Sequence, residues 1–363
     1  MSGLAAVATP APFGCGWSRA LDDAVTDLAW AADGAQLFVG TAGGLVYRFA
    51  SDGGEQRHWH AHDGGLTRLC PQPGNTGVVA TAGEDGRVLL WDANAQQACE
   101  TLANGSDWVE HLAWTPDGSV LAAAARKTIS LWRGGESLGM WFDARRHVLA
   151  MAWAPDNRRL ATAANKGLFL WRLDGDGAEP VPLLSFPGAP VAVAWQPNGK
   201  ALAVGTQDGF LQLWLPGNGT KAARQLTMRG YPSKVACLAW HPRTALIATA
   251  GGPDIVLWTL PRDGGGTQGN PLRHHRATIT ALAWSDDGAL LASGDRSGRL
   301  CISDDTGDVV FTRRFNHEIA ALQWRPGRTV LALGDNGGAL HLVDRHTAAD
   351  PFDPSPTQEN LRD

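Results

Sequence analysis

Residues 109–132, VEHLAWTPDGSVLAAAARKTISLW, contain the pattern that decides the fold of this protein. The stretch opens with a segment ending in Ala-Trp, turns at an Asp-Gly pair, and continues through a run of small apolar residues. It closes with an alternating segment that ends in a second tryptophan. Alternation with a period of two is typical of a half-buried strand, and Asp-Gly favours the tight turn of an antiparallel hairpin. The stretch therefore predicts three consecutive antiparallel strands.

The same pattern recurs along nearly the whole chain. Its first segment ends at positions spaced 39 to 45 residues apart, namely Trp30, Cys70, Trp114, Trp153, Trp195, Trp240, Trp284 and Trp324. A second alternating segment follows in each repeat, and a weaker fourth segment such as EQRHWH follows that. A repeat of this length without any amphipathic helix indicates a row of four-stranded sheets.

The composition argues against a nucleic-acid partner, a disulfide framework and a membrane location. The 31 Lys and Arg residues nearly balance the 36 Asp and Glu residues, and no long basic run occurs, so nucleic acid is not an expected partner. The five cysteines are scattered, which favours neither a disulfide framework nor a zinc ribbon. The sequence predicts neither a signal peptide nor a membrane span, and a cytoplasmic location is expected.

Tryptophans at the ends of the second segments identify the family that the repeats resemble. These are Trp91, Trp132, Trp171, Trp214 and Trp258, and Asp92 completes one Trp-Asp pair. Over residues 13–345 the chain resembles the WD-repeat β-propeller family. The resemblance implies an all-β protein, a single propeller of four-stranded antiparallel blades around a channel. Eight repeats predict eight blades; seven is the alternative, because the last two repeats lack the second tryptophan.

The two ends of the chain predict how the ring closes. The eighth repeat contains only three strands, whereas the segment GCGWSRAL before the first repeat supplies one spare strand. We therefore expect an N-terminal strand to complete the last blade. Residues 1–12 and the polar, Pro-containing segment 346–363 are predicted to be disordered.

The second repeat contains a set of polar residues to which the resemblance assigns a structural role. In the family, a histidine four residues before the first strand bonds toward an Asp in the second turn, and a Ser or Thr and the Trp complete a buried network. His62 precedes Leu66 by four residues, and Thr81, Asp85 and Trp91 follow with the family spacing. This set is predicted to be the one complete network in the chain.

Other repeats keep only parts of this set. The seventh repeat has His275 and Ser293, but Ser297 and Ser303 stand at the Asp and Trp positions. The other blades are therefore expected to be held together by packing alone.

Two further histidines, His58 and His60, precede the structural one in HWHAHD. Residues i and i+2 of a strand share a face about 6.5 Å apart, so two imidazoles could reach one zinc ion. A third ligand would have to come from elsewhere. The alternative is that both histidines lie on the outermost strand of a blade, in contact with solvent.

The resemblance also implies where a partner binds. Loops into the first strands and turns between the second and third strands surround one mouth of the channel. The predicted contact residues there are Trp108, Glu110, His147, Glu84, Gln207, Lys234, Arg296 and Glu318. Trp108 is the expected hot spot, with packing against a neighbouring blade as its alternative role.

Three functions are consistent with these features. The favoured one is a non-enzymatic scaffold that binds a protein or peptide partner of unknown identity, without a cofactor. A zinc-handling protein that uses His58 and His60 is the first alternative. A cofactor-dependent propeller enzyme is the second, although the sequence offers no catalytic constellation.

Overall fold

The computed structural model describes residues 12–93, 97–142, 147–164, 167–174, 177–184, 188–216, 224–260 and 268–345. These residues form 32 β-strands, arranged in eight separate four-stranded antiparallel sheets. The prediction of eight blades is confirmed, and the seven-bladed alternative is wrong. The described residues include no helix with the length and hydropathy needed to span a bilayer.

Blades 1 to 4 each contain four strands in chain order, from the innermost to the outermost. Blade 1 contains β2 (Val25–Trp30), β3 (Gln36–Thr41), β4 (Leu45–Ala50) and β5 (Glu55–His60). Blade 2 contains β6 (Leu66–Pro71), β7 (Val78–Gly83), β8 (Arg87–Asp92) and β9 (Gln97–Asn104). Blade 3 contains β10 (Val109–Trp114), β11 (Leu121–Ala125), β12 (Thr128–Arg133) and β13 (Glu136–Phe142). Blade 4 contains β14 (Val148–Trp153), β15 (Arg159–Ala164), β16 (Gly167–Asp174) and β17 (Gly177–Leu184).

Blades 5 to 7 repeat this order, and blade 8 takes its outer strand from the start of the chain. Blade 5 contains β18 (Pro190–Trp195), β19 (Leu202–Thr206), β20 (Leu211–Leu215) and β21 (Arg224–Met228). Blade 6 contains β22 (Cys237–Trp240), β23 (Leu246–Ala250), β24 (Ile255–Thr259) and β25 (Gly269–Leu272). Blade 7 contains β26 (Ile279–Trp284), β27 (Leu290–Asp295), β28 (Arg299–Asp304) and β29 (Val309–Arg314). Blade 8 contains β30 (Ile319–Trp324), β31 (Val330–Asp335), β32 (Ala339–Arg345) and β1 (Phe13–Ala20).

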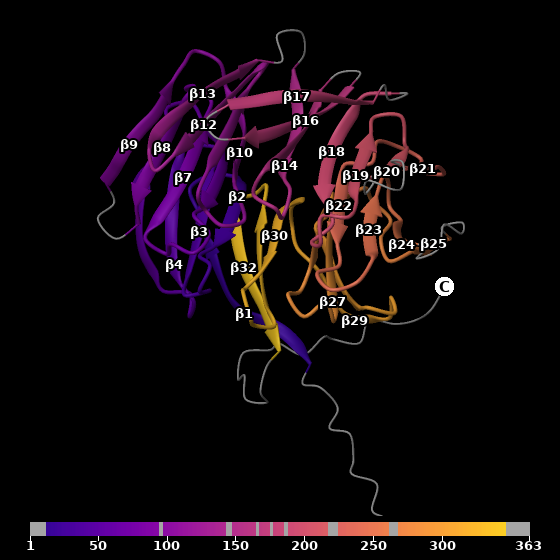
Figure 1. The fold of residues 1–363 in the computed structure, drawn as a ribbon. Coiled ribbons are helices and arrows are strands. Elements are labelled where there is room, and N and C mark those ends of the chain that lie inside the picture. Colours follow the sequence, from indigo (N-terminus) through magenta and orange to yellow (C-terminus); the bar gives the residue numbers. More distant parts are fainter. Residues whose placement is uncertain are drawn as a thin grey trace, which may run out of the picture.

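The eight blades form a closed ring. The first strand of each blade contacts the first strands of both neighbouring blades, and β2 of blade 1 contacts β30 of blade 8. Figure 1 shows the chain travelling around this ring, so that its indigo beginning lies against its yellow end. The first strands consequently line the central channel.

The N-terminal strand closes the ring as the sequence predicts. Strand β1 pairs antiparallel with β32, from Phe13 opposite Arg345 to Ala20 opposite Ala339, and the two strands lie side by side in Figure 1. Phe13 is buried in the core cluster of blades 7 and 8. The segments 1–11 and 346–363, which fall within the predicted disordered ends, lie outside the described residues.

Glycines in the second strands set the distance between blades. A Cβ atom at Gly40 would lie 2.4 Å from the Leu66 side chain of the next blade, and one at Gly334 would lie 2.4 Å from Val25. Any larger residue at these positions would push the neighbouring first strand outward. The small residues of the second strands therefore let the twisted sheets pack face to face.

The tryptophans that end the first strands connect successive blades. In six blades the indole N–H donates to a backbone carbonyl of the preceding blade, over 3.0 to 3.2 Å. The pairs are Trp114 with Cys70, Trp153 with Ala113, Trp195 with Ala152, Trp240 with Ala194, Trp284 with Ala239 and Trp324 with Ala283. We call this series the indole ladder. It explains why the same residue recurs at the same strand position.

The indole ladder is interrupted at the two junctions that involve blade 1. Blade 2 has Pro71 at the tryptophan position, one residue after the Cys70 that the repeat spacing predicted, so no indole reaches back to blade 1. Blade 1 has Trp30, but its buried Nε1 has no hydrogen-bond partner among the described residues. The side chain of Gln323 instead accepts a hydrogen bond from the backbone N–H of Trp30 across the closure, at 2.6 Å.

Candidate binding surface at the mouth of the channel

One end of the ring carries two hollows. Because the strands of each blade alternate in direction, the loops into the first strands and the turns between second and third strands lie at this same end. Seven of the eight predicted contact residues line these hollows. We refer to this end as the rim.

The first rim hollow lies at blades 3 and 4 and has a volume of about 430 Å³. Trp108, Glu110 and His147 line it together with Arg126 and Lys127. The Trp108 side chain is 54% exposed, so it does not pack between blades as the alternative interpretation supposed. A hydrogen bond between His147 Nε2 and the Glu110 carboxylate links β10 to the residue before β14. Trp108 therefore shares its hollow with two polar side chains that hold each other in place.

The second rim hollow lies across blades 5 to 8 and has a volume of about 720 Å³. Gln207, Lys234, Arg296 and Glu318 line it, from four different blades. Arg296 and Glu318 lie 3.7 Å apart. Residues far apart in sequence are thus brought to one surface by the ring.

The eighth predicted contact residue, Glu84, lines neither hollow. Its backbone N–H donates to the Gly65 carbonyl at 3.0 Å, and its side chain lies beside the loop that leads into β6.

Below the rim, three first strands carry ionisable residues at equivalent positions in the channel. Asp27, Arg68 and His111 occupy them, whereas the other five blades have alanine or cysteine there. Burial raises the pKa of Asp27, although Arg68 opposes this. Burial, reinforced by Arg68, lowers the pKa of His111 to about 4. This cluster was not predicted, although its signal, three polar residues at one strand position, is visible in the sequence.

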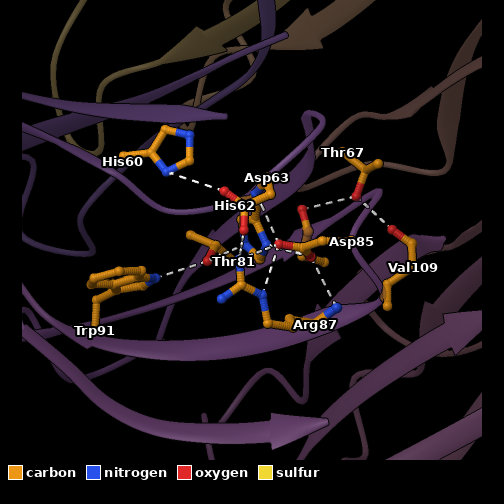
Figure 2. Close-up of polar contacts among 10 residues, drawn as sticks. His60, His62, Asp63, Thr67, Thr81, Asp85, Arg87, Trp91 and Val109 are labelled. Atoms are coloured by element: carbon orange, nitrogen blue, oxygen red, sulfur yellow. Dashed lines mark hydrogen bonds and ion pairs between the residues drawn. The ribbon is translucent and has the colours of Figure 1, made fainter. Parts of the chain in front are cut away.

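The polar set of blade 2 forms a continuous hydrogen-bonded chain (Figure 2). The Trp91 indole N–H donates to the Thr81 hydroxyl at 2.8 Å, and that hydroxyl lies 2.8 Å from His62 Nε2. His62 Nδ1 lies 2.9 Å from Asp85, which also accepts a hydrogen bond from Arg87. The structure therefore brings the four predicted side chains together.

The protonation states follow from this geometry. Burial lowers the pKa of His62, although its hydrogen bond to Asp85 opposes the shift. Burial alone would raise the pKa of Asp85, but hydrogen bonds from His62 and Arg87 outweigh it and lower that pKa. A neutral imidazole then accepts from Thr81 at Nε2 and donates to Asp85 at Nδ1.

The expectation that blade 7 lacks such a network is wrong. His275 Nδ1 lies 2.9 Å from Asp295, and its Nε2 lies 2.8 Å from the Ser293 hydroxyl. The carboxylate comes from the last residue of β27, two positions before Ser297, whose hydroxyl donates to it. A strand end and a turn lie equally close to the imidazole, so the carboxylate position cannot be read from spacing alone.

Blade 6 contains a third version, in which tyrosine replaces histidine. Tyr231 lies four residues before Val235, as His62 lies before Leu66. Its hydroxyl lies 2.5 Å from that of Thr249 and accepts the Trp258 indole N–H at 2.7 Å. This network was not predicted, because the family pattern has histidine rather than tyrosine at this position.

The histidines considered as zinc ligands lie on the outermost strand of blade 1. His58 Nδ1 pairs with Glu55 at 2.9 Å, and His60 Nδ1 lies 3.8 Å from Asp63. Both imidazoles are more than half exposed. Within the described part of the chain, no group of three or more His, Cys, Asp or Glu side chains is placed to hold a metal ion.

An eight-bladed ring with histidine- or tyrosine-centred networks defines the class of the protein as a β-propeller of repeated blades. The model of the family "WD domain, G-beta repeat" matches six stretches, 53–92, 97–133, 141–172, 180–214, 223–259 and 266–304. These cover more than half of the chain, and the chain belongs to the WD-repeat family. The matches run from an outer strand through the third strand of the next blade. They omit the first three strands of blade 1, the outer strand β29 of blade 7 and all of blade 8.

Curated relatives share the repeats over part of their length. Telomerase protein component 1 of Rattus norvegicus is 26% identical over 62% of this chain and 9% of its own length. The protein transport protein sec13 of Aspergillus oryzae is 33% identical over 22% of this chain and 31% of its own. This chain therefore spans less than a third of either relative.

Among solved structures, the computationally designed protein Ika8 has a similar fold. Its TM-score is 0.76 with 20% sequence identity, and the match covers 89% of this chain and 96% of that one. At this identity the likeness shows the fold alone.

Proposed function

We propose that this protein is a non-enzymatic scaffold that binds a protein or peptide at the rim. The observation that supports this best is Trp108, which is 54% exposed at the edge of a hollow otherwise lined by polar and charged residues. Rigid aromatic side chains at such positions tend to dominate binding energy. The WD-repeat relatives, a protein transport protein and a telomerase component, also fit a role within an assembly.

The charges of the second hollow suggest one property of the partner. Lys234 and Arg296 share this hollow with a single acid, Glu318, and the other lining residues are uncharged. A partner that spans both hollows would place an apolar group at Trp108 and an acidic group near Lys234. Complementary charge of this kind speeds encounter and fixes orientation more than it adds affinity.

Site-specific photo-crosslinking tests the proposal. A photoreactive amino acid at position 108 is expected to capture a defined partner in cells. The matched control carries the same group at Val310, an apolar residue of β29 that is 42% exposed on the outside of blade 7. Capture of the same protein from both positions would count against a rim site.

The zinc alternative has a separate test. Elemental analysis of dialysed protein, beside a His58→Ala/His60→Ala variant, would support it if one zinc per chain were found and lost in the variant. Within the described part of the chain, no third side chain is placed to complete a zinc site with His58 and His60.

A further inference from the structure

In five of the six blades whose structure is described at this position, a side chain fills the gap beside the blade's own third strand. It lies four residues before the leading apolar residue of the first strand. At this plug position the described blades carry Leu21, His62, Gly105, Tyr231, His275 and Phe315. Five of these six residues are large, and Gly105 of blade 3 is the exception.

Backbone hydrogen bonds show that the plug positions are structurally equivalent. The His62 N–H donates to the Gly44 carbonyl at 3.2 Å, and the Gly105 N–H donates to the Gly86 carbonyl at 3.1 Å. The Phe315 N–H donates likewise to Gly298 at 2.7 Å. Blade 3 therefore follows the same path but leaves the gap unfilled.

The gap is a recess of about 470 Å³ between blades 2 and 3 that opens to solvent. Val88, Val109, Ala123 and Trp132 form part of its apolar lining, and Ser130 is among the polar residues. Ala123 stands where Thr81 stands in blade 2, so two parts of the network are absent together. Such a volume is typical of small-molecule and side-chain sites.

The Trp132 indole N–H is a hydrogen-bond donor in this recess. Trp132 occupies the position of Trp258, whose indole N–H donates to the Tyr231 hydroxyl in blade 6. Among the described residues, no acceptor meets the Trp132 indole N–H, although this side chain lines the recess. A group that restores the arrangement of blade 6 would be an aromatic ring bearing an acceptor oxygen.

We propose that the recess of blade 3 binds a tyrosine side chain supplied by a partner protein. The ring would fill the gap that plugs fill in other blades, and its hydroxyl would accept the Trp132 N–H as Tyr231 accepts that of Trp258. Ser106 and Asp107 line both the recess and the first rim hollow, so one segment could contact Trp108 and the recess together. The proposal stands on the recess itself and does not require the rim site.

The test titrates the protein with N-acetyl-tyrosinamide and follows the Trp132 indole signal by NMR, assigned through its loss in Trp132→Phe. We expect a saturable shift, with N-acetyl-phenylalaninamide binding about fivefold more weakly, since it lacks one hydrogen bond. Gly105→Tyr should fill the recess from within and abolish binding, whereas Gly105→Ala should keep it. A Cβ at Gly105 meets only the Gly86 oxygen, at 3.7 Å, so the backbone accepts either residue.

Several results would overturn the proposal. They are no shift at all, equal binding of both amides, or unchanged binding in Gly105→Tyr. Binding of p-cresol without N-acetyl-tyrosinamide would assign the recess to a free phenol instead. If Gly105→Tyr fails to fold, the Trp132→Phe variant tests the proposal by itself. Calorimetry should show that Trp132→Phe binds N-acetyl-tyrosinamide and N-acetyl-phenylalaninamide equally, and a retained preference for tyrosine would overturn the proposal.

Discussion

In the polar networks of blades 2 and 6, a threonine hydroxyl contacts the histidine or tyrosine at the start of the blade. In blade 2 the Thr81 hydroxyl accepts from Trp91 and contacts His62, all within a buried site. Buried donors and acceptors that lose their partner cost more than the bond itself contributes. The networks therefore fix one arrangement of loop, turn and strand in each blade that has them.

Replacement of Thr81 by valine should reveal this cost. Thr81→Val removes the hydroxyl but keeps the shape, and it should lower the free energy of unfolding by about 2–3 kcal/mol. Thr81→Ser keeps the hydroxyl and should lose about 1 kcal/mol for one methyl group. Guanidinium unfolding measures both; equal losses would show that packing alone holds this site.

The correction in blade 7 gives a second test at single residues. Asp295→Ala should destabilise the protein by about 2–4 kcal/mol, because it leaves His275 and two backbone N–H groups without a buried acceptor. Ser297→Ala should cost less than about 1 kcal/mol. A larger loss in Ser297→Ala than in Asp295→Ala would instead assign the partner of His275 to Ser297, the residue at the family's Asp position.

Among the elements, the first strands carry both the channel lining and the indole ladder. Their last residue reaches back to the preceding blade in six blades, so each blade is bonded to the one before it. The junctions of blade 1 rely on other hydrogen bonds. Gln323 of blade 8 accepts the Trp30 backbone N–H, Asp27 of blade 1 accepts the Leu69 backbone N–H of blade 2, and Arg48 donates to the Ala93 carbonyl.

The indole ladder offers a matched pair of variants. Trp240→Phe should cost about 1–2 kcal/mol more than Trp30→Phe, because only the first leaves a carbonyl, that of Ala194, without its donor. Both changes remove a similar volume. Thermal unfolding compares them, and indistinguishable losses would mean that the indole N–H groups contribute nothing.

Strand β1 should be essential for a stable, monomeric ring. Deletion of residues 1–20 removes the buried Phe13 and exposes the edge of β32, so we expect a loss of at least about 3 kcal/mol and self-association. Deletion of residues 1–11 is the control, since it keeps β1. Size-exclusion chromatography and chemical unfolding read out the two effects; a stable monomer lacking β1 would contradict the closure.

For the whole molecule, buried histidines link stability to pH. The pKa values of His62, His111 and His275 are lowered chiefly by burial, so the unfolded chain binds more protons than the folded one below about pH 6.5. Their contribution is complete above that pH and is lost as pH falls toward the folded pKa values, about 4 for His111. The unfolding midpoint should therefore drop between pH 7.5 and pH 5; an unchanged midpoint would contradict neutral buried imidazoles.

Much of this molecule could be predicted from sequence because its signals are local and repeated. Strand period, Asp-Gly turns and recurrent tryptophans give the eight blades, and a spare strand gives the closure. The carboxylate of Asp295 and the hydroxyl of Tyr231 were missed, since equivalent atoms can come from different positions or residue types. The recess of blade 3 was missed because its signal is an absence, at Gly105.

The most direct test of the rim as a binding surface is amide hydrogen exchange of the protein with and without the partner captured from position 108. We expect added protection in the loop before Val109 and at Lys234 and Arg296, with the outer strands unchanged. Protection confined to outer strands such as β29, or to the opposite end of the ring, would contradict it.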